Sequence, residues 1–238
     1  MTRFPFFILL AAFAGLSPGI PGKSEFGKII TLPGGQEYRV FYAGKSEVGL
    51  SLKRPSQSDK NIILCIPAAF TRLDNGKPDG FIAENGSHNG SKSKTNGVGG
   101  ACLICEKYTT LFPLEKGAPL PDSLVSVIEK NKCDFFQQIQ IVNKGKVPGF
   151  KDKSLWQRRC FGSDKKGNML VIEGLKPQTL AEFSADLPSF GGYNALYTDM
   201  GSYDEGWYRN EQGKIIPLGL VRTSTKYQSN WLFFRQKP

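Results

Sequence analysis

The chain has 238 residues, of which 39% are hydrophobic and 22% are charged, and its formal net charge at pH 7 is +10. This is an ordinary globular composition, long enough for one large domain or two small ones, and one domain is the better expectation. The lysines and arginines are scattered, without the basic run that follows a phosphate backbone, which argues against nucleic-acid binding.

The N-terminus has the pattern of a secretory signal peptide. Residues 1–3 give a positive start, residues 4–13 are apolar, and residues 12–14 carry small side chains at A-x-A spacing. Serine and proline then interrupt the apolar run, well short of the about 20 residues that span a bilayer. We expect a signal peptide over 1–14, cleaved as late as about residue 22. The mature domain, 23–238, is then soluble, with no transmembrane segment, in a bacterial periplasm or exterior.

The cysteines do not form a dense or even set. There are five, Cys65, Cys102, Cys105, Cys133 and Cys160. A disulfide framework would be denser and even in number, and a zinc site would have to be assembled from scattered thiols and the single histidine, His88. We therefore expect no metal site, and we expect the cysteines to be small buried hydrophobic residues.

Strand-like segments dominate the chain. They alternate or form short apolar runs typical of half-buried and buried strands. The predicted strands are 36–42, 61–70, 80–84, 101–108, 135–142, 168–173, 194–198 and 231–235. A stretch rich in glycine, serine and asparagine, 85–100, is predicted to be a flexible loop because it cannot bury enough apolar area.

Two segments have a helical pattern. Residues 124–130 follow Asp122 or Ser123 as a cap, and place Leu124, Val127 and Ile128 on one face. The second helix begins with the capping-box spacing of Thr179 and Glu182 and buries Leu180, Phe183 and Leu187 before Pro188 ends it. Many strands with two helices predict a single α+β domain with a large mixed β-sheet core.

Four segments of the second half then come in a particular order. They are a strand ending in the turn 143–146, the segment 158–173 with its arginine and spaced glycines, the Thr179 helix, and the run NALYTDMGS at 194–202. That order resembles the phosphodiester glycosidase family, which includes the lysosomal uncovering enzyme and many bacterial exopolysaccharide-associated proteins. The family has N-A-L-x-L-D-G-G-x-S at the last of these positions. The likeness extends upstream to 66–70 and 78–86 and covers roughly residues 61–209.

This chain departs from the family pattern at three places. The asparagine of the first motif falls on Pro67, a glycine of the last motif falls on Met200, and the tail 203–209 is longer and more aromatic than usual. These departures leave the expected fold intact. They make loss of turnover the alternative to activity.

The resemblance implies cleavage between the anomeric carbon of a sugar and a phosphodiester oxygen. Such a bond breaks through an oxocarbenium-like state, which needs a carboxylate, and Asp199 is the candidate. Arg158 is the candidate phosphate clamp, because a guanidinium binds two phosphate oxygens at once. Arg159 could replace it, although neighbours on one strand point to opposite faces. Glu84 is either a second carboxylate or a solvated acid at a strand end.

Further residues are candidates for contacts with substrate. Exposed N–H groups at Gly201 and the Ser202 hydroxyl could bind phosphate or sugar, unless Ser202 is a plain turn residue. Tyr203, Trp207 and Tyr208 could stack on a sugar ring or simply pack the loop onto the sheet. Gln138 could face a glycan or mark the solvent side of its strand.

The leading hypothesis is therefore an exported hydrolase of glycosyl phosphodiesters in a glycoconjugate or surface polysaccharide. The alternative is a non-catalytic protein of the same fold that binds a glycan or phosphoglycan. In both cases the partner is a carbohydrate and not a nucleic acid. No cofactor is predicted, and no ligand cluster in the sequence supports a divalent cation, although the family sometimes works with one. The oligomeric state is left open.

Overall fold

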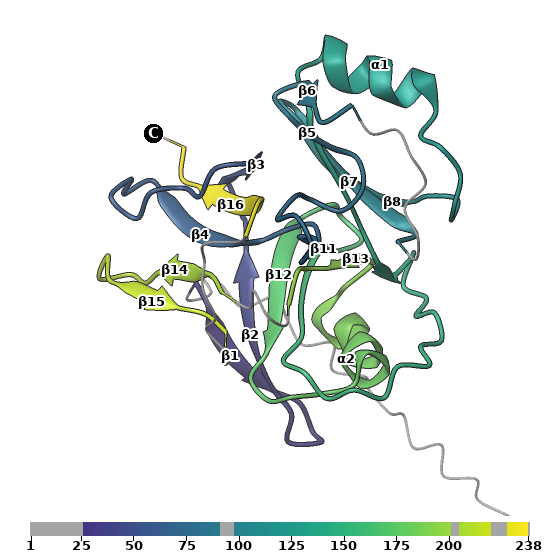
Figure 1. Cartoon of the computed structure of the whole chain (residues 1–238). Helices are drawn as coiled ribbons and strands as arrows, with labels where there is room; N and C mark the ends of the chain where they lie inside the picture. The colour runs from purple at the N-terminus through teal and green to yellow at the C-terminus, as the bar shows by residue number, and fades with distance from the viewer. Residues whose placement is uncertain (1–25, 91–97, 201–204, 220–227, 238) are drawn as a thin grey trace, which may run out of the picture.

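The computed structural model describes residues 26–90, 98–200, 205–219 and 228–237. Its strands form three sheets, and every pairing between named strands is antiparallel. Two helices, α1 (Asp122–Lys130) and α2 (Leu180–Asp186), and a 3-10 turn, η1 (Leu187–Phe190), complete the described elements. The α+β class is confirmed, with the strands divided among three antiparallel sheets where the sequence suggested one mixed sheet (Figure 1).

The six-stranded sheet has the order β1 (Lys28–Thr31), β2 (Glu37–Tyr42), β12 (Met169–Gly174), β11 (Arg159–Ser163), β13 (Asn194–Tyr197) and β10 (Gln140–Val142). The β4 sheet has the order β15 (Ile215–Pro217), β14 (Trp207–Arg209), β4 (Ile62–Pro67), β16 (Trp231–Arg235) and β3 (Glu47–Ser51). The β9 sheet has the order β6 (Ser87–His88), β5 (Ile82–Glu84), β9 (Asp134–Gln138), β7 (Gly100–Cys105) and β8 (Tyr108–Pro113).

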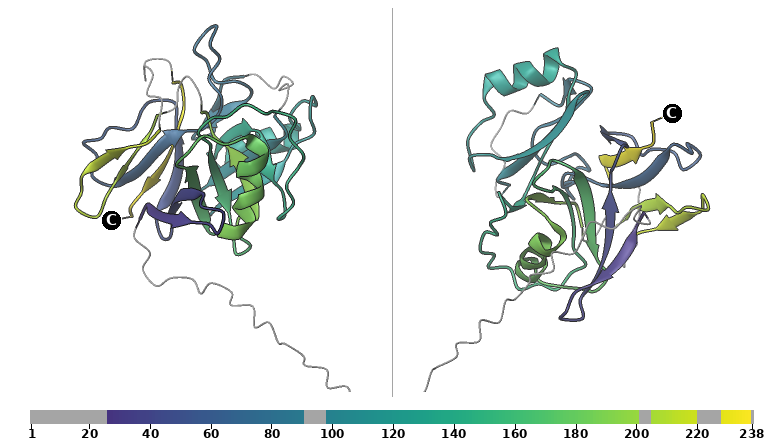
Figure 2. Two further views of the ribbon diagram at one scale, coloured as in Figure 1. Left: turned by 90° about the horizontal axis from the view of Figure 1, so that it is seen from below. Right: turned by 180° about the vertical axis from the view of Figure 1, so that it is seen from behind.

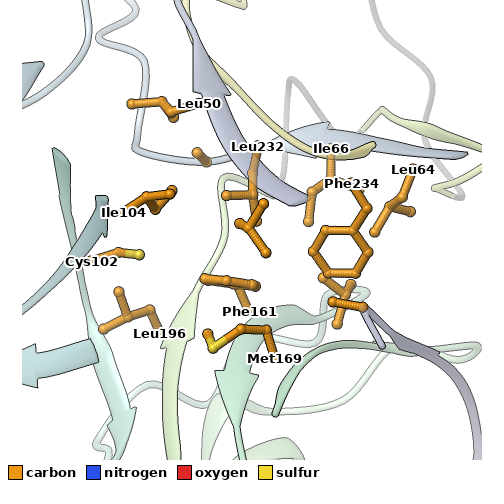
Figure 3. Packing of buried hydrophobic residues seen from close by; sticks show 14 of the residues in the cluster. Leu50, Leu64, Ile66, Cys102, Ile104, Phe161, Met169, Leu196, Leu232 and Phe234 are labelled. Carbon is orange, nitrogen blue, oxygen red and sulfur yellow. The ribbon is translucent and has the colours of Figure 1, made fainter. Parts of the chain in front are cut away.

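One hydrophobic core joins the three sheets. Each sheet turns one apolar face inward, as strand alternation allows, and the side chains interdigitate (Figure 3). Phe161 comes from the six-stranded sheet, Phe234 from the β4 sheet and Phe136 from the β9 sheet, and all three are fully buried. Because all three sheets contribute side chains to this one core, the described chain forms one domain.

Each helix covers the outer face of one sheet. Helix α2 packs on the six-stranded sheet through Leu180 and Phe183, and α1 packs on the β9 sheet through Val125 and Ile128 (Figures 1 and 2). No helix in the described parts of the chain is long and apolar enough to cross a membrane.

The N-terminal cap predicted from the sequence is confirmed for one helix and wrong for the other. Helix α2 has the predicted capping box: the Glu182 amide donates to the Thr179 hydroxyl, and the Thr179 amide donates to the Glu182 carboxylate. In α1 the predicted cap is wrong, because Pro121 holds the N-cap position. Of its predicted buried face, Ile128 is buried and Leu124 packs against the core, whereas Val127 is exposed and Val125 is buried instead.

The predicted strand 135–142 is divided between two sheets. Residues up to Gln138 pair in the β9 sheet, and Gln140 begins the pairing with β13 in the six-stranded sheet. Ile139 is the crossing point, and its carbonyl accepts from the Tyr197 amide. This crossing brings one end of the β9 sheet beside the end of β13.

Part of the predicted loop 85–100 is ordered in the fold. Asn85 and Gly86 both have positive φ, at 49° and 78°, and they turn the chain from β5 into β6. This is the Asn-Gly hairpin signal, which the composition of the surrounding stretch had masked. Residues 91–97 of the predicted loop lie outside the described residues.

Two of the five cysteines form a disulfide, which the sequence did not predict. Cys105 and Cys133 form a disulfide with a Cα–Cα distance of 4.5 Å. They follow the β7–β9 register, in which Ile104 pairs with Asp134, so they lie directly opposite each other. Cys65, Cys102 and Cys160 are free and buried, as predicted.

This disulfide should stabilise the fold appreciably. It closes a loop over a sequence separation of 28 residues, for which chain entropy predicts a loss of about 3–4 kcal/mol in unfolding free energy on removal. We expect that loss in urea unfolding of the double variant Cys105→Ser, Cys133→Ser. Reductant should lower the stability of the wild type and leave the double variant unchanged. Equal stability of the oxidised wild type and the variant would contradict the assignment.

Candidate functional site

Asp199 lies two residues after the end of β13 at Tyr197. Its side chain is 5% exposed, and one carboxylate oxygen accepts from the Thr71 amide at 2.9 Å. Its own amide donates to the Ala68 carbonyl at 3.1 Å. The acid is thus held at both ends by the main chain that follows β4.

Burial determines how this acid ionises. Desolvation raises the pKa of Asp199 to about 7, and hydrogen bonds from Thr71 offset the rise only in part. A carboxyl group with such a pKa can exchange a proton near neutral pH, which is what acid–base chemistry requires. Perturbed acids of this kind are candidates for functional sites.

The register between β11 and β13 places Arg158 opposite Asp199. Cys160 pairs with Tyr197, and the Thr198 amide continues the ladder by donating to the Arg159 carbonyl at 3.1 Å. The same register, extended beyond the ends of both strands, sets Arg158 level with Asp199. Cross-strand partners project to the same side of a sheet, so both side chains lie on the face that α2 covers.

The Arg158 guanidinium is buried and partly committed to the protein. Nε donates to the Gln178 carbonyl at 3.0 Å, and Nη2 donates to the Ser154 carbonyl at 2.7 Å. Asp152 also accepts from Nη2, at 3.4 Å. Within the described residues, the contact of Nη1 is a long one of 3.4 Å to the Tyr197 hydroxyl. Nη1 is therefore the part of the group best able to bind something else.

Tyr197 connects the two charged groups. Arg158 lies 5.7 Å from the centre of its ring, and the ring contacts Phe70 at a centroid distance of 6.1 Å. Burial raises the pKa of Tyr197, Arg158 opposes that rise, and Asp199 adds to it. Both charges therefore act on the phenol, although Arg158 and Asp199, both within the described chain, form no ion pair with each other.

Gln138 reaches the same corner from the β9 sheet. It is fully buried, and its Nε2 donates at 3.2 Å to the Ala68 carbonyl that also accepts from Asp199. It therefore braces the segment after β4 and is not on a solvent face. From the β4 sheet side, Asn230 holds Ala69, accepting from its amide at 2.7 Å and donating to its carbonyl at 3.0 Å.

Arg159 points to the opposite face, as alternation predicts. It is fully buried, forms an ion pair with Glu173, and donates to the Glu205 carbonyl at 3.0 Å. This network also includes Arg39 and Arg54. Arg159 is thus a core residue between sheets and does not replace Arg158 beside Asp199.

Glu84 is not brought to this cluster. In the β5–β9 pairing Ile82 lies opposite Phe136, so Glu84 lies level with Asp134. Asp134 is four residues along β9 from Gln138, which is roughly 13 Å in a strand. Glu84 is thus an acid at the end of a strand, which was the alternative to a role as second carboxylate.

The two aromatic residues of β14 are core residues. Trp207 is 1% exposed and packs with Cys65 and Trp231, and Tyr208 packs on Phe41 at a centroid distance of 5.0 Å. Neither offers a ring face to a sugar. Both residues pack the chain onto the sheet, which was the alternative to stacking on a ligand. Gly201, Ser202 and Tyr203 lie outside the described residues.

Sequence reasoning missed Thr71 and Tyr197 as members of the site. Tyr197 could have been found, because it is two residues before Asp199 on a strand and so shares its face. Thr71 could not, because its contact depends on how the end of β4 lies against β13. The described residues contain no group of three or more His, Cys, Asp or Glu side chains able to hold a metal ion.

No model of a known protein family matches the chain, and no curated protein matches it in sequence. Among solved structures, the fold is similar to the catalytic domain of zebrafish N-acetylglucosamine-1-phosphodiester alpha-N-acetylglucosaminidase, auto-inhibited by its pro-peptide. The TM-score is 0.58 at 13% identity, over 90% of this chain and 83% of that chain. The likeness is one of fold. A hypothetical protein from Synechocystis has a TM-score of 0.47 at 11% identity, over 88% of this chain and 61% of that chain.

The raised pKa of Asp199 predicts a stability that falls with pH. The folded state binds the proton up to pH about 7, whereas the unfolded chain releases it near the ordinary value of 3.8. Stability should therefore decrease as pH rises from about 4 to 7 and then level off. The variant Asp199→Asn should lose this slope and be more stable at pH 8 by on the order of a few kcal/mol.

Urea unfolding at several pH values checks this expectation. The exposed acid Glu211 supplies a matched control, because Glu211→Gln makes the same change in charge without a buried carboxyl. A parallel pH dependence in the wild type and Asp199→Asn would show that Asp199 is ionised normally.

Proposed function

We propose that the protein is an exported hydrolase that cleaves the bond between a sugar and a phosphodiester in a glycoconjugate or surface polysaccharide. The observation that carries the proposal is the buried acid Asp199. It lies just beyond the end of β13, level with Arg158 when the β11–β13 register is extended, in a fold similar to that of a phosphodiester glycosidase catalytic domain. Fold similarity alone does not establish an activity, so the proposal depends on this side-chain arrangement.

In the proposed reaction the bond between the anomeric carbon and the phosphodiester oxygen breaks. Water adds its hydroxyl to the anomeric carbon, and its proton leaves to solvent, so that the products are the free sugar and a phosphate monoester. Ionised Asp199 stabilises the oxocarbenium-like state or assists the attack of water. Nη1 of Arg158 and the Tyr197 hydroxyl supply hydrogen-bond donors for the departing phosphate.

Export is part of the proposal. The apolar N-terminal pattern of residues 4–13 lies outside the described residues and favours a signal peptide. The disulfide between Cys105 and Cys133 supports the same compartment, because disulfides persist mainly in the periplasm and outside the cell.

A second function is favoured by two observations. Pro67 stands where the family pattern has an asparagine, and most donors of Arg158 are already bound within the protein. A protein with these features could bind a phosphoglycan without cleaving it. Turnover distinguishes the two functions.

The central test is release of a fluorophore from a sugar-1-phosphodiester. We expect the wild type to release it with kcat/KM rising with pH to a plateau above about 7, because Asp199 must be ionised. We expect Asp199→Asn to lose at least about a hundredfold in kcat, with Glu211→Gln unchanged. Binding of the substrate without release by the wild type would establish the second function.

Arg158→Lys tests the phosphate contact. A lysine keeps the charge but loses the planar fork, so we expect kcat/KM for the phosphodiester to fall about tenfold or more. A phosphate-free aryl glycoside of the same sugar is the comparison substrate. Equal losses on both substrates would mean that Arg158 acts only by holding Tyr197 and Ser154.

A further inference from the structure

The segment before β11 carries an exposed tryptophan beside the candidate site. Trp156 is 50% exposed and Leu155 is 63% exposed. Trp156 precedes Arg158 by two residues, on the connection that leads past α2 into β11 (Figure 1). An indole of this size is ordinarily buried to a large extent, so its exposure at this place needs an explanation.

Trp156 is held in place by its backbone. Its amide donates to the Gln178 carbonyl at 3.2 Å, and its carbonyl accepts from the Gln178 amide at 2.8 Å. The same Gln178 carbonyl accepts from Nε of Arg158 at 3.0 Å. One buried residue therefore fixes both the exposed indole and the guanidinium of the site.

Trp156 and Arg158 are also close to each other in space. Both precede β11, which begins at Arg159, and both donate to the same Gln178 carbonyl. Gln157, between them, points away and donates to the Gly174 carbonyl at 3.0 Å. Trp156 therefore lies next to Arg158 of the candidate site.

The charges around Trp156 suit an anionic ligand. Residues 151–158 contain three cations, Lys151, Lys153 and Arg158, against one acid, Asp152. That acid already accepts from Ser154 and Arg158. A segment that combines lysines with an exposed aromatic residue favours a ligand with both phosphate and sugar groups.

On this basis, and resting on the function proposed above, we infer that Trp156 forms a sugar-stacking subsite. It binds a further sugar of an anionic phosphoglycan, next to the phosphodiester at Arg158. An anionic membrane is the less favoured occupant of this surface. Leu155 and Trp156 are flanked by the polar residues Ser154 and Gln157, so they do not extend into the continuous apolar face that insertion needs.

The tryptophan content of the chain allows a direct measurement. The chain has three tryptophans, and the other two, Trp207 and Trp231, are each 1% exposed. Quenching by acrylamide therefore reports mainly on Trp156. The experiment adds an oligomer of phosphodiester-linked N-acetylglucosamine to the Asp199→Asn variant, which should not consume it, and measures protection from quenching. We expect clear protection by the oligomer and little by phosphatidylglycerol vesicles.

Kinetics supply the second measurement. We expect Trp156→Ala to raise KM for the oligomer about tenfold with little change in kcat. KM for a single-sugar phosphodiester should stay within about twofold, because that substrate does not reach the subsite. Trp156→Phe should restore most of the affinity. Tyr108→Ala removes another exposed aromatic residue, 49% exposed on β8, and should change nothing.

The outcomes separate this inference from the proposed function. If the wild type cleaves the single-sugar substrate but the oligomer does not protect Trp156, the subsite is wrong and the activity stands. If the oligomer protects Trp156 but nothing is cleaved, the activity is wrong and the subsite belongs to a binding protein. Protection by vesicles and not by the oligomer would overturn the inference in favour of a membrane surface.

Discussion

The antiparallel pairing of β11 with β13 is the constraint on which the candidate site depends. It places Arg158 across from Asp199 and sends Arg159 to the other face, where Glu173 binds it. A slip by one residue would exchange the two arginines. The same slip would turn Phe161 away from the core that the three sheets share and would put Cys160 in its place. The apolar core that both strands share therefore fixes the register and, with it, the chemistry of the site.

Burial of Asp199 in its ionised form destabilises the fold. The main-chain amide of Thr71 recovers part of the lost solvation, and the pKa near 7 shows that the recovery is incomplete. The surrounding structure tolerates this because the segment after β4 is braced from two directions, by Gln138 from the β9 sheet and by Asn230 from the β4 sheet. Such a locally unfavourable group in a rigid frame is typical of sites where function and not stability selected the residue.

Local patterns accounted for much of the fold and for part of the site. The α2 capping box and the placement of Asp199 at a strand end could be predicted, because both depend on residues close in sequence. The opposite orientations of Arg158 and Arg159 followed from alternation alone. The position of Glu84 and the Cys105–Cys133 pairing could not be predicted, because they depend on which strands pair. The choice between stacking and packing for Trp207 could not be made for the same reason, because it depends on the pairing of β14 with β4.

The hydrogen bonds that hold Asp199 affect how far the sequences of such proteins can diverge. Its partners on the β4 side are a carbonyl and an amide of the main chain, at Ala68 and Thr71. Every amino acid except proline supplies both groups, so substitutions along this stretch can accumulate while the acid keeps its place. A frame built from peptide groups leaves little trace in an alignment. Relatives of this protein are then better recognised by superposing backbones than by matching letters.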